Sequence, residues 1–150
     1  MTENHLWNLA KNVRIQTSPE IVGNFNIGFD SRIPEETKDM LMDFVYWVED
    51  HFALPVTLWV DFKYNHYLLS QDKKRVGYRF YWVDFENYPV FEKEADIPVI
   101  ELAVRQERQT KEDILRSFIG AISRYFAWLT NTKLNDVDEE AVLCAYLNDR

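Results

Sequence analysis

The sequence has little cysteine, glycine or proline, and each shortage excludes a class of protein. A single cysteine, Cys144, cannot form an internal disulfide, which excludes a secreted disulfide framework. Only 4 glycines and 5 prolines occur in 150 residues, so long disordered linkers are not expected. No apolar run approaches the roughly 18 residues of a membrane helix, and residues 1–5 lack the basic start of a signal peptide. We therefore predict a cytoplasmic protein with no membrane partner.

The charge balance lacks the basic excess of a nucleic-acid-binding protein. The formal net charge is −8, whereas contact with phosphates requires a basic face, so the sequence predicts no nucleic-acid partner. The acids are spread along the chain, which favours solubility as the reason for the charge. The alternative is an acidic interaction module, for example a decoy of a nucleic-acid-binding protein.

The length and the hydrophobic content predict one domain over residues 1–150. Hydrophobic residues make up 47% of the chain, which is enough for a packed core. A chain of this size buries roughly 68–70% of its unfolded surface when it folds. It therefore needs neither a disulfide nor a structural metal for stability.

Hydrophobic periodicity predicts strands and helices that are largely segregated along the chain. A short amphipathic segment is expected within residues 1–20 and an irregular acidic loop at 86–97. The predicted elements are a strand at 21–29, a helix from Pro34 to Phe52, strands at 56–62, 66–69, 75–85 and 99–104, and helices from Thr110 and from Asp136. The polar turn at 70–74 joins two strands as a hairpin. This order predicts an α+β fold with an antiparallel or mixed sheet of about four strands.

The helix that begins at Thr110 has the clearest local signals. Thr110 can cap its first turn, and Asp113 stands at the capping-box position. Apolar residues then recur at helical spacing and form one stripe. The members of this stripe are Leu115, Phe118, Ile119, Ile122, Phe126 and Leu129.

Residues 114–128 of this helix read ILRSFIGAISRYFAW. This segment resembles the active-site helix of small gluzincin-type zincins, in which an apolar turn leads into HExxH, followed by Tyr, one residue, Gln and Trp. Tyr125 and Trp128 match the aromatic positions of that pattern. The acidic start of the next helix, with Glu139 and Glu140, resembles the segment that holds the third zinc ligand in these proteins. The resemblance covers about residues 20–148 and implies a zincin-like fold with an N-terminal-half helix, a central active-site-type helix and a C-terminal helix.

The three positions that carry the chemistry depart from the zincin pattern. The two histidine positions fall on Gly120 and Arg124, and the position of the catalytic Glu falls on Ala121. Glycine offers no donor, arginine is a permanent cation, and alanine cannot act as a general base. The resemblance therefore implies a pseudoenzyme with no catalytic residue, no metal and no cofactor. Its expected role is to bind a peptide or protein partner, or to act in regulation or structure.

The resemblance also implies where a peptide would lie, because the edge strand of a zincin lines the substrate groove. The groove residues expected on this basis are Tyr78, Tyr81, Trp82, Tyr125 and Trp128. We further hypothesise that Arg124 occupies the space of the lost metal and forms an ion pair with Glu139 or Glu140. Gly120, which is costly within a helix, indicates close packing at that point.

Other candidate chemistry is weaker. The sequence has 3 histidines, and no pair of them has the spacing of a metal site. Cys144 follows an apolar helical pattern and is expected to be a buried small residue rather than a nucleophile. Asp61, Asp84 and Glu86 could converge as the paired carboxylates of a metal-independent hydrolase. Alternation along the strands explains them better as solvent-facing residues.

Overall fold

The computed structural model describes residues 25–52, 57–83, 97–130 and 139–149. The segment predicted within residues 1–20 and residues 86–96 of the loop predicted at 86–97 lie outside these ranges, and Ile97 begins a strand. Nine helices and strands are described in this part of the chain: β1 (Phe25–Phe29), α2 (Glu35–His51), β2 (Leu58–Lys63), β3 (Leu68–Leu69), β4 (Arg75–Val76), β5 (Tyr78–Val83), β6 (Ile97–Ala103), α3 (Lys111–Thr130) and α4 (Glu139–Asn148).

The principal sheet has four strands in the order β1-β2-β6-β5. The strands β1, β2 and β6 run parallel, whereas β5 runs antiparallel to β6 at the edge of the sheet. A parallel pair needs a crossover, and α2 supplies the one between β1 and β2. The prediction of an α+β fold with a mixed sheet of about four strands is confirmed within the described residues.

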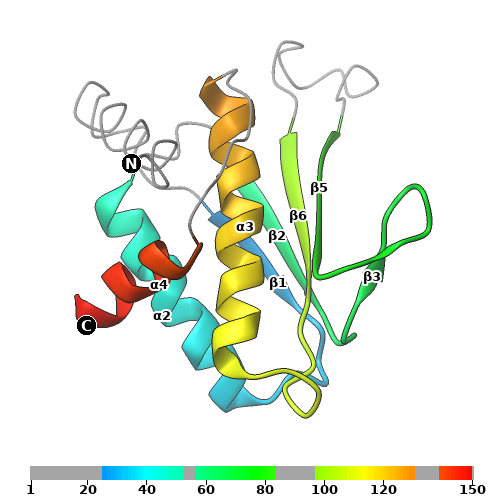
Figure 1. Ribbon diagram of the computed structural model, residues 1–150, viewed down its shortest axis with the longest axis horizontal. Coiled ribbons are helices and arrows are strands. Elements are labelled where there is room, and N and C mark those ends of the chain that lie inside the picture. The colour runs from blue at the N-terminus through cyan, green and yellow to red at the C-terminus, as the bar shows by residue number, and fades with distance from the viewer. Residues whose placement is uncertain (1–24, 53–56, 84–96, 131–138, 150) are drawn as a thin grey trace.

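The helices α2 and α3 pack on one face of this sheet, and α4 packs on these two helices on the same side (Figure 1). Strand alternation gives the reason, since Leu58, Val60 and Phe62 of β2 are buried under the helices while Trp59 is 42% exposed. Aromatic rings join the layers: Phe118 of α3 lies edge-on to Phe62 at 5.3 Å between ring centroids. The opposite face of the sheet carries the polar alternate residues.

The chain between β2 and β5 forms a separate two-stranded hairpin, in which β3 pairs antiparallel with β4. The predicted hairpin around residues 70–74 is therefore confirmed. The predicted strand 75–85, however, is broken at Gly77, and its longer part, β5, pairs with β6 instead of continuing the hairpin. A Cβ on Gly77 would lie 2.6 Å from Oγ of Ser117, so any other residue here would force the Ser117 side chain to shift where the backbone passes close to α3.

Local signals set the ends of the two long helices. Pro34 precedes the first turn of α2, where Glu35 and Glu36 favour the positive end of the helix dipole. At the start of α3, Oγ1 of Thr110 accepts a hydrogen bond from the backbone N–H of Asp113 at 3.0 Å, which confirms the predicted cap. No helix among the described residues is long and apolar enough to cross a membrane.

Candidate peptide-binding cleft

The positions that match the zincin motif lie where α3 packs against the edge strand β5. Gly120 and Ala121 are buried, and Arg124 is exposed one turn further along the helix. Residues four apart share one face of a helix. Gly120 and Arg124 therefore face the same neighbour, which is Tyr78 at the start of β5.

The ring of Tyr78 and the carboxylate of Glu139 close the space beside Gly120. A Cβ added to Gly120 would lie 3.2 Å from Cε2 of Tyr78 and 3.2 Å from Oε2 of Glu139. Both distances are shorter than ordinary van der Waals contact. The close packing predicted from a glycine in mid-helix is confirmed, and a longer side chain at this position requires both neighbours to move.

Arg124 lies against this group, but not in the ion pair that we hypothesised. Its Nε donates a hydrogen bond to the hydroxyl of Tyr78 at 3.3 Å. Glu140 instead accepts hydrogen bonds from Nε and Nη2 of Arg116 at distances of 2.8–3.1 Å. Among the residues that the structure describes, no ion pair joins Arg124 to Glu139 or Glu140. Arg116 lies about two turns before Arg124 on α3 and is the arginine that contacts the start of α4.

A cleft with a volume of about 1110 Å³ opens along β5. Arg124 borders it on the side of α3, and the turn of the β3–β4 hairpin borders it on the other side. The lining residues are Ser70, Gln71, Asp72, Val76, Gly77, Tyr78, Arg79, Phe80, Tyr81, Trp82, Glu101 and Arg124. The cleft therefore follows the outer edge of the sheet and combines aromatic rings with charged side chains.

Backbone polar groups of β5 point into this cleft. The backbone N–H of Ala103 donates to the carbonyl of Gly77 at 2.9 Å, which fixes the hydrogen-bonding parity of the β5–β6 ladder. By this parity Arg79 and Tyr81 exchange backbone hydrogen bonds with β6, since they face Glu101 and Val99 in the register. The N–H and C=O groups of the alternate residues point outward from the sheet. These alternate residues are Tyr78, Phe80 and Trp82.

The predicted groove residues divide into two groups. Tyr78, Tyr81 and Trp82 line the cleft, and Tyr81 and Trp82 are 39% and 53% exposed. Tyr125 is fully buried in the core instead, and Trp128 is half-buried, with its ring 6.4 Å from that of Phe80. The two helix aromatics thus support the wall behind β5 and do not line the cleft.

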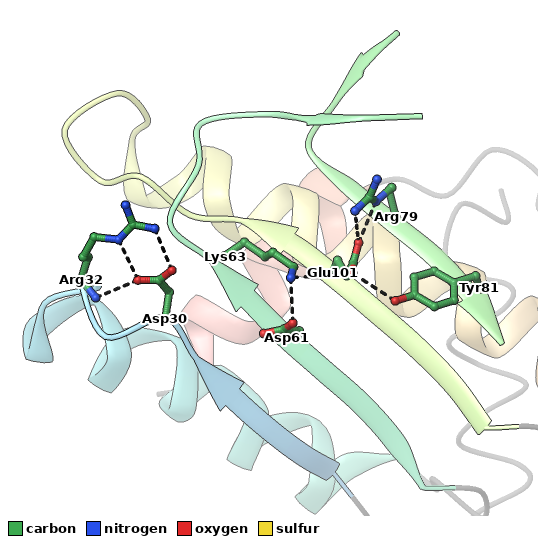
Figure 2. Close-up of polar contacts among 7 residues, drawn as sticks. All are labelled: Asp30, Arg32, Asp61, Lys63, Arg79, Tyr81 and Glu101. Carbon is green, nitrogen blue, oxygen red and sulfur yellow. Dashed lines mark hydrogen bonds and ion pairs between the residues drawn. The ribbon is translucent and has the colours of Figure 1, made fainter. Parts of the chain in front are cut away.

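The face of the sheet away from the helices carries a polar network centred on Glu101 (Figure 2). Its carboxylate accepts hydrogen bonds from Nε of Arg79 at 2.7 Å and from the hydroxyl of Tyr81 at 3.0 Å. Lys63 Nζ lies 3.1 Å from Asp61 and 3.9 Å from Glu101. Burial and then the bond to Glu101 raise the pKa of Tyr81 above its ordinary value of 10.0. The network keeps Tyr81 protonated and fixes Arg79 beside the cleft.

The carboxylate cluster differs from the one suggested for a hydrolase. Asp61 lies opposite Glu101 in the register of β2 and β6, whereas Asp84 and Glu86 lie outside the described residues. Sequence reasoning missed Glu101, Arg79 and the hairpin turn as neighbours of the groove. The available signal was Glu101 itself, an acid at an alternate position within the otherwise apolar strand IPVIELA.

The remaining candidates lie outside the cleft. Cys144 is exposed and not buried, because α4 turns Val142, Leu143 and Tyr146 toward the core and leaves Cys144 on the other side. His51 bonds to Asp149 at 2.9 Å and links the ends of α2 and α4. Within the described part of the chain, no three His, Cys, Asp or Glu residues are grouped as metal ligands.

Three kinds of comparison were made with known proteins, and no family model, no curated protein and no solved structure was found to match this chain.

Proposed function

We propose that this chain is a zincin-like protein without peptidase activity that binds an extended peptide segment along the outer edge of β5. The observation that carries the proposal is that the outer edge of β5 has backbone groups that point away from the sheet, beside a cleft. Three outward-pointing backbone positions, Tyr78, Phe80 and Trp82, border a cleft of about 1110 Å³. An exposed strand edge binds extended segments through main-chain hydrogen bonds, while side chains alternate into the flanking surface.

The arrangement of elements supports the zincin-like part of the proposal. The resemblance implies a helix, a strand, a hairpin and a further strand ahead of the active-site helix, with the edge strand along the substrate groove. Here α2, β2, the β3–β4 hairpin, β5 and β6 precede α3 in that order, and β5 is the antiparallel edge strand. Gly120 faces this strand through its contact with Tyr78.

The side chains at the motif positions support binding rather than hydrolysis. Gly120 and Ala121 have no side-chain atom that can donate a lone pair or take a proton. Arg124 carries a permanent positive charge, which opposes a bound cation. The ring of Tyr78 also fills the space into which a longer side chain at Gly120 would extend. A peptide can therefore lie along β5 without any group from α3 that would attack it.

The experiment is a selection of displayed nine-residue random peptides on the purified protein, followed by anisotropy titrations of the selected peptides. The matched variants are Trp82→Ala and Trp82→Pro. Both variants remove the exposed indole, but only proline also removes the backbone N–H of residue 82. This N–H points outward, so its loss leaves the hydrogen bonds between β5 and β6 intact. Proline is tolerated at a strand edge of this kind.

We expect Trp82→Pro to bind the selected peptides at least about tenfold more weakly than Trp82→Ala, since it loses one main-chain bond and blocks strand addition. Circular dichroism melts of the two variants control for folding. Equal affinities of the two variants, or a selection that yields no binding peptide, would contradict the proposal.

A further inference from the structure

The cleft of this acidic protein is bordered by a basic hairpin turn, and its own lining balances Arg79 and Arg124 against Asp72 and Glu101. The hairpin turn and the cleft together hold five cations and two carboxylates, a formal charge of +3 in a chain of net charge −8. The cations are Lys73, Lys74, Arg75, Arg79 and Arg124, and the carboxylates are Asp72 and Glu101. On the other side of the molecule, α2 carries six carboxylates against Lys38 alone. The cations of the hairpin favour an acidic ligand at this border of the cleft over one at α2.

Arg124 is the cation of this region that is placed to receive such a ligand. Arg79 is already bound to Glu101, and Arg75 stacks on Tyr67 with its guanidinium carbon 4.3 Å from the ring centroid. Arg124 is exposed at the cleft and, among the described residues, has no carboxylate within ion-pair distance. Its bond from Nε to Tyr78 holds the guanidinium in place and leaves both terminal nitrogens available as donors.

The strand geometry brings alternate side chains of an added peptide to the side of β5 on which Arg124 and Trp82 lie. The side chains of Tyr78 and Phe80 lie on the α3 side of β5, since they contact Arg124 and Trp128 of α3, and strand alternation puts Trp82 on the same side. An added strand follows the same alternation, so every second peptide side chain faces α3. A residue beside Tyr78 meets Arg124, and a residue further along the same face meets the exposed Trp82.

We propose that the ligand of the cleft is an acidic extended peptide, in which an Asp or Glu side chain pairs with Arg124 and an apolar side chain on the same face contacts Trp82. The inference rests on the proposed function, since it assumes strand addition to β5. A guanidinium binds a carboxylate through two parallel hydrogen bonds, which gives the acidic residue a fixed position in the peptide. Arg124 is then the residue that determines specificity.

The test uses peptides from the selection described above, each made with its acidic residue and with the isosteric amide. Affinities are measured by fluorescence anisotropy on the full chain and on the variants Arg124→Gln and Arg75→Gln. We expect a loss of about 10- to 100-fold for the amide peptide on the wild type, and a similar loss for the acidic peptide on Arg124→Gln. The two losses should not add, because they remove the same contact.

Arg75→Gln is the control for general charge, since it removes a cation from the same hairpin without touching the α3 side. This substitution should lower the affinity for the acidic peptide by less than about threefold, as expected for a screened surface charge. Selected peptides that lack an acid at a constant position, or that bind Arg124→Gln as tightly as the wild type, overturn the inference and leave strand addition intact. Failure of the proposed function is recognised separately, by equal binding to Trp82→Ala and Trp82→Pro.

A single-stranded RNA oligonucleotide of random sequence is the probe for the competing class of ligand. It should bind weakly, because net charge −8 repels phosphates outside the cleft. RNA binding that is tighter than that of the selected peptides, falls steeply with salt and requires Arg124 would overturn the acidic-peptide assignment.

Discussion

The ring of Tyr78 lies against the Cα of Gly120, and Nε of Arg124 donates to the hydroxyl of the same tyrosine at 3.3 Å. One residue of the edge strand therefore contacts two positions of α3 that are one helical turn apart. The tyrosine fills the space beside Gly120 and orients Arg124 toward the cleft.

The contact between Tyr78 and Gly120 predicts non-additive stability changes. In a helix interior, Gly→Ala gains about 1 kcal/mol, but a Cβ here lies 3.2 Å from the Tyr78 ring, and overpacking costs about 1–3 kcal/mol. We expect Gly120→Ala to lower the free energy of unfolding in the wild type, and to lower it less or not at all in a Tyr78→Ala background, where only the carboxylate of Glu139 still lies 3.2 Å from the new Cβ. Urea denaturation of the four proteins measures the coupling.

Gly28→Ala is the control for this cycle. A Cβ at Gly28 would meet only Oδ1 of Asp61, at 3.8 Å, and this contact is unrelated to Tyr78. Its effect should be the same with and without Tyr78→Ala. If Gly120→Ala also changes stability equally in both backgrounds, the close contact of the tyrosine with α3 is refuted.

The cap of α3 gives a second prediction. Oγ1 of Thr110 satisfies the backbone N–H of Asp113, one of the donors that a helix start leaves without a partner. Thr110→Ala should lower the free energy of unfolding by about 1 kcal/mol, whereas Thr110→Ser keeps the hydroxyl and should retain most of the stability. Thermal or urea unfolding checks both variants, and an equal loss in the two would mean that the methyl group, not the cap, is responsible.

The cap and the apolar stripe of α3 were predictable from sequence because both depend on residues within a few turns of one another. The pairing of β5 with β6 was not, since it joins residues about twenty positions apart and depends on the turn of the backbone at Gly77. The positions of Arg124 and Glu140 depend on the same non-local packing. Spacing alone could not decide which arginine meets Glu140, and Arg116 does.

Tyr125 shows where the sequence could have been interpreted better. It stands seven residues after Phe118, so it lies on the same helical face as a core residue. Both side chains are fully buried. The resemblance to the zincin motif favoured a groove position, but helical periodicity alone assigns this tyrosine to the core. Phe118 and Tyr125 therefore belong to one apolar stripe.

The contacts of Asp30 in the turn between β1 and α2 predict a lowered pKa for its carboxyl group. Asp30 accepts hydrogen bonds from Nε and Nη2 of Arg32 at 3.0 and 2.9 Å and from its backbone N–H at 2.9 Å. These bonds lower the pKa of Asp30 from 3.8 to about 2. The ionised form is thus favoured in the folded state, so its contribution to stability is present above pH 3.8 and is lost as the pH falls toward 2.

Carbon-detected NMR of the Asp30 carboxyl measures this pKa directly. Arg32→Ala removes the side-chain bonds and should raise the pKa toward 3.8, although the backbone bond remains. Lys63→Ala is the control, because Lys63 makes the smallest of the contributions to this shift and should change the pKa little. A wild-type pKa near 3.8 would show that the bonds to Arg32 do not persist in solution.

The proposed kinship with zincins makes a prediction about a gain of metal binding. In the resemblance Gly120 and Arg124 hold the positions of the two histidine ligands, and Oε2 of Glu139 lies beside Gly120. A variant with Gly120→His, Arg124→His and Tyr78→Ala should therefore bind one equivalent of Zn²⁺, because the last change makes room for the new imidazole. Titration with Co²⁺, followed by its visible absorption and displaced by Zn²⁺, measures the site.

Two further substitutions in this background identify the third ligand. Glu139→Gln should lower the affinity for the metal ion at least about tenfold, since it removes a charged ligand at the site. Glu140→Gln should have little effect, because Glu140 faces Arg116 on the outer side of α4. A folded variant that takes up no metal, or one that depends on Glu140 rather than Glu139, would show that α3 and α4 are not aligned as the zincin motif requires. The proposed binding of a peptide along β5 would then have to stand without a zincin-like ancestry.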